Sequence, residues 1–308
     1  MPPAQHSTDR PTLGILLMVC GVACFAVMDA TIKWLTEDFA VTQIVALRSW
    51  FGLPVLFALV YLEGGISSLK TTRPGAHSLR YLLVLALSFS FFWVLSQMKL
   101  VDAIAITFAS PILIAALSVP VLKESVGIHR WLAILVGFVG ILIMLRPGSG
   151  VFQWASVVAL GSTIVYAILM ITTRALKSTE STAALMFYPQ VGMAITGAVF
   201  VPFFWIPPSP VELGLFALAG TFGSLGILCL TNAFRLAPAA TVSPFEYSAL
   251  IWAALLGYFL WQEIPDKFIV LGSTVVISSG MYILYRETIK TGGVQPKLPG
   301  MSPDDIGQ

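Results

Sequence analysis

Three charged residues, Asp29, Arg48 and Glu246, interrupt long apolar stretches of this 308-residue chain. A charged side chain in hydrocarbon costs about 2.5–3.5 kcal/mol on insertion scales, so each of the three needs a partner or a function. An arginine binds carboxylate or phosphate groups, and an acidic side chain binds an amine or a proton. These residues therefore predict a binding site for a charged small molecule inside a membrane.

Asp29 and Arg48 are spaced so that they can meet. Asp29 lies six residues before Leu35, where the first apolar segment ends, and Arg48 lies seven residues after Val41, where the second begins. At 1.5 Å per helical residue, both lie roughly 10 Å below the same membrane boundary. One interpretation is a structural ion pair, shared with Lys33 one turn beyond Asp29. The other is that Arg48 receives the carboxylate or phosphate of a substrate.

Glu246 follows Pro244, and a proline frees a backbone carbonyl and bends a helix. Burial disfavours a charged carboxylate, which makes Glu246 a candidate proton carrier or a counter-charge for a substrate amine. The alternative is a structural contact with Arg235 or Asn232, and the sequence leaves both interpretations open.

Aromatic residues accompany these charges deep in the apolar segments. Phe89, Trp93 and Gln97 are spaced by four and share one helix face, and Phe25 shares a face with Asp29. Such rings either line a pocket or pack between helices and against lipid. The side chains predicted to bind substrate together with the three charged residues are Phe25, Trp93, Gln97, Tyr166, Tyr188 and Tyr247.

The composition requires membrane helices to position these residues. Hydrophobic residues make up 57% of the chain and charged residues 10%, and the mean hydropathy is +0.89. A water-soluble fold could not cover this apolar surface, and spanning about 30 Å of hydrocarbon takes roughly 20 helical residues. We therefore predict an all-α membrane protein with ten transmembrane helices, at Leu13–Leu35, Val41–Leu62, Leu79–Met98, Asp102–Val121, Ile128–Arg146, Gln153–Thr173, Ala183–Phe204, Val211–Arg235, Ala239–Leu260 and Lys267–Arg286.

Lysine and arginine predict how the helices are oriented. With a cytoplasmic N-terminus, twelve of these residues lie on the inner side of the membrane and four on the outer side. We expect a multi-pass protein of the cell inner membrane with both termini in the cytoplasm. Residues 1–12 then form an N-terminal tail, and residues 287–308, which are rich in Gly and Pro, form a disordered C-terminal tail.

The two halves of the chain resemble each other. Phe25-Ala26 and Thr31 match Tyr166-Ala167 and Thr172 at a constant offset, and a second set of matches links the segments around Ile112 and Ile251. The repeated units are residues 13–146 and 153–286, each with five predicted helices. Because five is odd, the second unit must enter the membrane from the opposite side, which predicts two inverted five-helix repeats.

These halves resemble two EamA-type domains of the drug/metabolite transporter superfamily. The resemblance rests on "MDATIKWL", "IVALRSWFGL" and "DAIAITFASPILIAALSVPVLKES" in the first half and on "NAFRLAPAATVSPFEYSALIWAALLGYFLWQEIPDK" in the second. One departure is Leu250, which stands where the first half has Pro111 and where family members often carry proline. The resemblance implies the inverted-repeat fold and a carrier function, and it places an arginine at the Arg48 position.

We expect a secondary transporter that moves a small organic metabolite through a central cavity by alternating access. The best substrate hypothesis is an amino acid, because the rings suit an apolar side chain, Arg48 a carboxylate and Glu246 an ammonium. S-adenosylmethionine, a vitamin or an organic cation would use similar chemistry. An intramembrane enzyme acting on lipid is the alternative of a different class, but no convincing catalytic set occurs in the sequence.

The sequence predicts few binding partners besides the substrate. His6, His77 and His129 fall in the predicted tail or loops, and no spacing of His, Cys and Asp suggests a metal site, so we expect no metal and no cofactor. We expect the lipid bilayer and a small-molecule substrate as partners, with a proton as the candidate coupling ion and no nucleic acid. Small residues on the helices would also allow a homodimer.

Overall fold

The long apolar runs fold as helices, because a helix pairs its own backbone groups in a solvent that offers no hydrogen bonds. The computed structural model describes residues 11–110, 112–114, 116–117, 128–145, 154–176, 179–236 and 243–292. All regular secondary structure in these ranges is helical. Residues 1–10, 146–153 and 293–308 and Pro111 are among those outside the described residues. The described parts of the two predicted tails, residues 11–12 and 287–292, are helical, so the prediction of a disordered tail is wrong for residues 287–292.

Ten α-helices in the described ranges, with no strand among them, confirm the predicted all-α fold class. The first half holds α1 (Pro11–Leu35), α2 (Val41–Leu62), η1 (Gly65–Leu69), α3 (Pro74–Gln97), α4 (Leu100–Thr107) and α6 (Ile128–Leu145). The second half holds α7 (Trp154–Leu176), α8 (Thr182–Phe200), η2 (Val201–Phe204), α9 (Pro210–Leu236), η3 (Ser243–Ser248), α11 (Ala249–Trp261) and α12 (Lys267–Gly292). Six described helices are long and apolar enough to cross a membrane, and four apolar helices are shorter.

Prolines explain where two helices depart from the prediction. α4 ends at Thr107 and is followed by a turn at Phe108 and Ala109. Pro111 has no N–H to bond the carbonyl of Thr107, which favours an interruption of the helix here. Helical residues resume at Ser110 and at residues 112–114, and α2 and α8 continue through Pro54 and Pro189. In the second half, a 3₁₀ turn over Ser243–Ser248 contains Pro244, and α11 begins only after it.

Two other helices have an end that differs from the prediction by five residues or more. α3 begins at Pro74 rather than Leu79, with the proline in its first turn, where a missing N–H costs nothing. α12 continues beyond Arg286 to Gly292.

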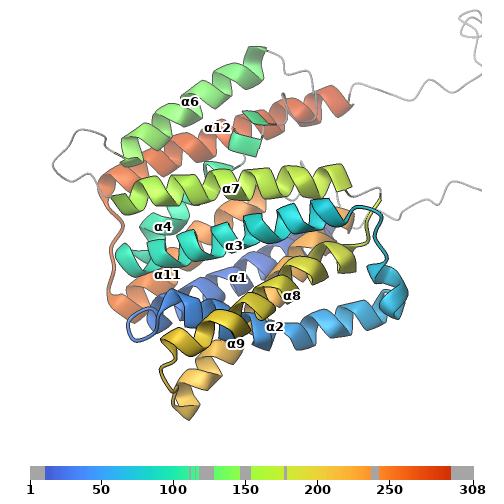
Figure 1. Cartoon of the computed structure of the whole chain (residues 1–308). Coiled ribbons are helices and arrows are strands. Elements are labelled where there is room, and N and C mark those ends of the chain that lie inside the picture. Colours follow the sequence, from blue (N-terminus) through green and yellow to red (C-terminus); the bar gives the residue numbers. More distant parts are fainter. Residues whose placement is uncertain are drawn as a thin grey trace, which may run out of the picture.

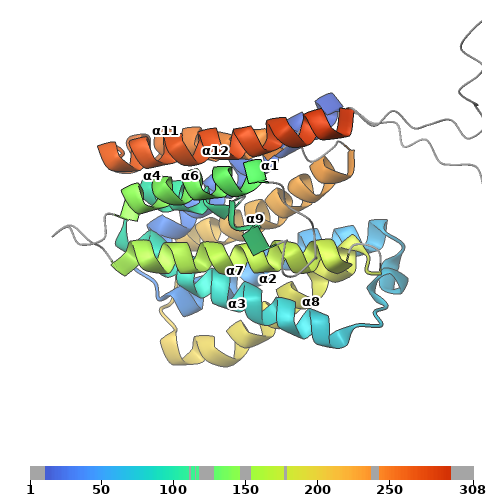
Figure 2. The ribbon, with the colours of Figure 1, turned by 90° about the horizontal axis from the view of Figure 1, so that it is seen from above.

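The chain direction alternates from helix to helix, which gives the bundle two ends. We call the end where α1 starts the near end and the end where α1 stops the far end. Figures 1 and 2 show α6 and α12 side by side at one edge of the bundle, with α2 and α8 toward the opposite side. α1 packs along α9, where a Cβ on Gly226 would lie 3.2 Å from the carbonyl oxygen of Gly21.

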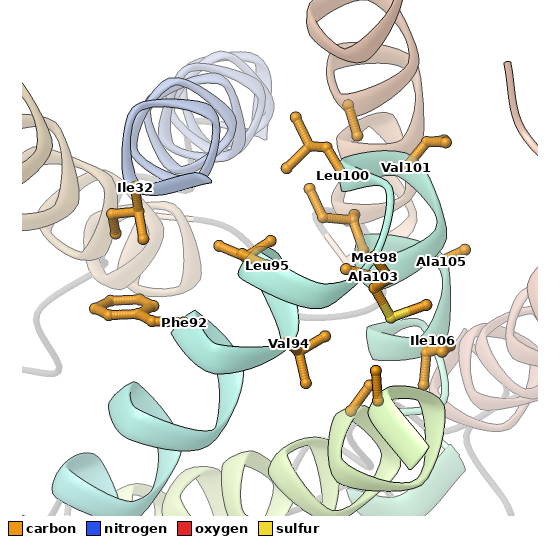
Figure 3. Close-up of a cluster of buried hydrophobic side chains, with 14 of the residues drawn as sticks. Ile32, Phe92, Val94, Leu95, Met98, Leu100, Val101, Ala103, Ala105 and Ile106 are labelled. Atoms are coloured by element: carbon orange, nitrogen blue, oxygen red, sulfur yellow. The ribbon is translucent and has the colours of Figure 1, made fainter. Parts of the chain in front are cut away.

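The apolar core joins α1, α3 and α4 toward the far end. Figure 3 shows Phe92 and Leu95 of α3 beside Ile32 of α1, with the connection through Met98 to Leu100 next to them. Ile32, Leu95 and Leu100 are fully buried. This packing holds α3 beside the segments of α1 and α2 that carry Asp29 and Arg48.

Candidate functional site

Arg48 lies at a junction of helices from both halves of the chain. It belongs to α2, whose backbone approaches α9 so closely that a Cβ on Gly220 would lie 2.9 Å from the amide nitrogen of Gly52. Its guanidinium carbon lies 5.2 Å from the ring centroid of Phe92 on α3, a cation–π contact. On the α9 side it faces Gly223, where an added Cβ would lie 3.3 Å from the terminal guanidinium nitrogen Nη2.

Asp29 of α1 lies near Arg48, and the two groups interact electrostatically. Asp29 is 8% exposed. Within the described part of the chain, Asp29 Oδ1 and Arg48 Nε have no hydrogen-bond partner, and neither residue forms an ion pair of 4.0 Å or less. Asp29 is buried and Arg48 half-buried with its Nε atom buried, and such an acid and base with unused hydrogen-bonding atoms can accept the charged groups of a ligand.

Phe25 lies one turn from Asp29 in α1 and packs against α9. A Cβ added to Gly226 would lie 3.1 Å from its ring. The half-buried ring therefore fills the contact between α1 and α9 next to the Asp29–Arg48 pair.

Trp93 lines a groove on the other side of α3. The groove has a volume of about 470 Å³ and is lined by Val41, Phe89, Ser90, Trp93 and Val158, which come from α2, α3 and α7. Its lining is largely apolar, and Trp93 is 39% exposed. Because Phe92, the neighbour of Trp93, contacts Arg48, the groove and the charged pair lie on adjacent faces of α3.

Glu246, Tyr166 and Tyr247 form a second cluster. Glu246 is half-buried in η3 and interacts electrostatically with both Tyr166 of α7 and Tyr247. The Tyr247 ring meets Phe108 edge-on, with centroids 5.3 Å apart. Its buried hydroxyl has no hydrogen-bond partner among the described residues. The cluster combines an acid with two phenols, which suits a cationic or hydrogen-bonding group.

Gln97 and Tyr188 lie apart from both clusters. Gln97 is exposed at the end of α3, where its Nε2 donates to Ser96 Oγ at 3.0 Å. Tyr188 of α8 lies at the near end, and its hydroxyl donates to the carbonyl oxygen of Leu69 at 2.7 Å.

The far end contains a cross-repeat contact that sequence reasoning missed. Lys33 Nζ lies 3.1 Å from Glu263 Oε1 and donates to the carbonyl oxygen of Met98 at 2.7 Å. Glu263 Oε2 also accepts from the Leu100 amide at 2.9 Å. Lys33 thus pairs with Glu263 and not with Asp29, which leaves the acid beside Arg48. The sequence places Lys33 and Glu263 at the same membrane boundary but does not by itself select this partner for Lys33.

The near end contains a second contact that was missed. His77 Nε2 lies 3.1 Å from Glu180 Oε2, and both side chains are almost completely buried. The prediction that the histidines fall in the tail or in loops is wrong for His77, because α3 starts at Pro74 and takes His77 into its first turn. His129 is likewise helical, near the start of α6.

A family comparison connects this geometry to a class of protein. The model of the EamA-like transporter family matches residues 12–146 and again residues 153–285, which together cover most of the chain. The chain belongs to the EamA-like transporter family. The residues described above are therefore those of a multi-pass membrane transporter of small metabolites.

Relatives of this EamA-like transporter carry different molecules. The chain is 29% identical to the S-adenosylmethionine uptake transporter of Rickettsia prowazekii, over 89% of this chain and 93% of that protein. It is 29% identical to the riboflavin transporter of Rhizobium johnstonii, over 91% and 93%. It is 26% identical to the pseudopaline exporter of Pseudomonas aeruginosa, over 86% and 93%.

A solved crystal structure has the same fold as this EamA-like transporter. It superposes with a TM-score of 0.63, covering 90% of this chain and 99% of the other chain, at 17% identity. At this level of identity, the likeness concerns the fold alone.

Proposed function

We propose that this protein carries an amphipathic metabolite with an α-amino-acid head group. The best candidates are free aromatic or hydrophobic amino acids and S-adenosylmethionine, which itself contains an amino-acid head. The observation that carries the proposal is that buried Asp29 and half-buried Arg48 leave two buried atoms, Asp29 Oδ1 and Arg48 Nε, without hydrogen-bond partners in the described residues. Arg48 would bind the substrate carboxylate, and Asp29 the ammonium.

Local geometry supports a ligand role for Arg48. The Phe92 ring covers one side of its guanidinium, which leaves the edge of the charged group free for a planar carboxylate. Gly223 of α9 lies on the opposite side of the guanidinium, and a side chain at this position would narrow the space in front of Arg48. A purely structural arginine at this depth would be expected to use its donors on neighbouring acids or carbonyls.

The apolar part of the substrate would lie in the groove beside α3. Phe89 and Trp93 offer aromatic surface in this open groove of about 470 Å³. This placement puts the head group of the substrate at Arg48 and the side chain of the substrate at Trp93, on adjacent faces of α3. It suits a bulky amino acid better than glycine or alanine.

Glu246 would supply a second negative charge for a cationic substrate. The sulfonium of S-adenosylmethionine is such a group, and Tyr166 and Tyr247 both interact electrostatically with the carboxylate. Under this assignment, Glu246 selects between substrates, and replacing it with glutamine would weaken S-adenosylmethionine transport more than phenylalanine transport. If E246Q instead abolished stimulation by a proton gradient for both substrates, Glu246 would be the proton carrier.

We further propose that transport proceeds by alternating access between the inverted repeats in the cell inner membrane. The excess of Lys and Arg on one side supports cytoplasmic termini, so that the near end would face the cytoplasm. A proton is the proposed coupling ion, and a homodimer is the proposed assembly.

Counterflow in sealed vesicles tests the substrate proposal, because it needs no driving ion. Vesicles preloaded with unlabelled S-adenosylmethionine, phenylalanine, riboflavin or choline would be given the same compound in labelled form. We expect saturable exchange of the first two, and its loss in R48A. Exposed Arg73 gives the matched control, because R73A removes the same charge from the near end. Exchange of riboflavin or choline alone would contradict the proposal.

A further inference from the structure

We propose that the His77–Glu180 pair is a proton-binding site, and that its protonation fastens the two repeats together at the near end and slows transport. This inference rests on the transport function proposed above. The imidazole Nε2 lies 3.1 Å from Glu180 Oε2, and the side chains are 3% and 0% exposed. Among the described residues, His77 Nδ1 and Glu180 Oε1 have no hydrogen-bond partner.

The pair joins the two repeats. His77 belongs to α3 in the first half, and Glu180 precedes α8 in the second. Tyr188 of α8 reinforces the contact, because its ring centroid lies 4.4 Å from that of His77 while its hydroxyl bonds Leu69 of η1. Ser181 Oγ also donates to the carbonyl oxygen of Ser68. An opening movement between the repeats at the near end must therefore either break the contact between His77 and Glu180 or move the two residues together.

Arg80 lies one helical turn beyond His77 in α3, and Arg73, the exposed N-cap residue of α3, lies one turn before it. The Arg80 guanidinium donates to neutral groups of the second half, namely the hydroxyls of Thr172 and Thr173 and the carbonyl oxygens of Leu169 and Leu185. Glu63 of the α2 end is the other described acid in this region, and its Oε2 accepts from the Ala183 amide at 3.0 Å. The imidazole is therefore faced by Glu180 from the α7–α8 connection, Tyr188 from α8 and Arg80 from its own helix.

The charges determine the direction of the effect. In the tautomer with its proton on Nε2, a neutral imidazole donates one hydrogen bond to the Glu180 carboxylate, and a second proton turns this bond into an ion pair. Coulomb energy falls with distance, so the carboxylate at 3.1 Å outweighs the repulsion from Arg80 a full turn away. Protonation thus strengthens the closed contact. Proton binding therefore makes opening of the near end less favourable, and opening in turn makes proton binding less favourable.

Sided pH jumps test this inference. Counterflow of phenylalanine or S-adenosylmethionine would be measured in vesicles whose protein orientation is known from protease access to the C-terminal tail. Lowering the pH on the near-end side from about 8 to about 5.5, the range in which histidine changes charge, should slow exchange by about fivefold. H77Q and E180Q should exchange substrate with at most a weak response to this change.

The Lys33–Glu263 pair provides a matched control, because it also joins the two repeats and is also 3.1 Å long. E263Q should keep the wild-type response to near-side pH. The inference is overturned if wild-type exchange does not respond to near-side pH, if H77Q and E180Q both keep the response, or if E263Q removes it equally. A failure of exchange in the wild-type protein would instead count against the proposed function.

Histidine NMR gives a readout that does not depend on transport. The chain has three histidines, so selective ¹⁵N labelling yields a simple spectrum in which H77Q identifies the His77 signal. We expect that signal to titrate, and its titration to change in E180Q and on addition of phenylalanine. A His77 signal that stays unchanged over the whole range would contradict the inference even if a variant folded poorly.

Discussion

Lys33 at the end of α1 and Glu263 just after α11 lie 3.1 Å apart and tie the two repeats together at the far end. Both side chains are largely buried, and each also binds backbone of the connection between α3 and α4. Removing one member of such a pair leaves an uncompensated charge, which is more costly than losing an exposed ion pair.

We predict that E263Q loosens the far end. Leu100, which is fully buried there, can be replaced by cysteine as a reporter. A membrane-impermeant maleimide should react with this cysteine about five- to tenfold faster in E263Q, because breaking a buried pair typically costs more than 1 kcal/mol. Glu212 lies at the same end and accepts a bond from the nearby Ser209 amide, so E212Q is the control that should leave labelling unchanged. Equal rates in E263Q and the parent would contradict the prediction.

We predict that G223A weakens substrate binding without unfolding the protein. The added Cβ would lie 2.6 Å from Met28 Sδ and 3.3 Å from an Arg48 nitrogen, so it narrows the space in front of the guanidinium. Because the added methyl group takes space from the substrate, the apparent KM in counterflow should rise about tenfold, equal to roughly 1.4 kcal/mol of binding free energy. Gly161 of α7 faces open space, so G161A is the matched control and should transport normally. Unchanged KM in G223A would remove Gly223 from the site.

We predict that W50F affects stability and not substrate affinity. Trp50 Nε1 donates to the carbonyl oxygen of Ala194 at 2.9 Å and joins α2 to α8. Loss of this bond should lower the free energy of unfolding by about 0.6–1.5 kcal/mol, the usual range for such contacts in membrane proteins. Thermal unfolding in detergent measures the effect, and the apparent KM for phenylalanine serves as the comparison. A changed KM at unchanged stability would place Trp50 in the site.

Apolar length and internal repetition were sufficient to predict the helices. The expected bounds for α2 agree with the structure at both ends, and α1 ends at Leu35 as expected. The largest differences occur near prolines: the helix that begins with α4 is interrupted by a turn before Pro111, and a 3₁₀ turn contains Pro244. The spacing of Asp29 and Arg48 from their helix ends was also enough to expect them at one depth.

Contacts between distant segments could not be derived in the same way. Nothing in the sequence around Lys33 shows that Glu263 rather than Asp29 is its partner, because that choice depends on how the repeats pack. Likewise, Tyr188 and Gln97 have suitable chemistry for a site, but the rotation of α8 and the end of α3 set where they lie. Helix periodicity specifies faces within one helix, and only the packed bundle shows which faces meet.

The most direct test of the account is whether Arg48 recognises a carboxylate. Counterflow inhibition would compare phenylalanine with phenylethylamine, which lacks the carboxylate, in the wild-type protein and in R48A. The account predicts that the wild type prefers phenylalanine by about ten- to a hundredfold, as expected for a charge-assisted bond of roughly 1.5–3 kcal/mol, and that R48A loses this preference. A correctly folded R48A that still prefers phenylalanine to the same degree would contradict it.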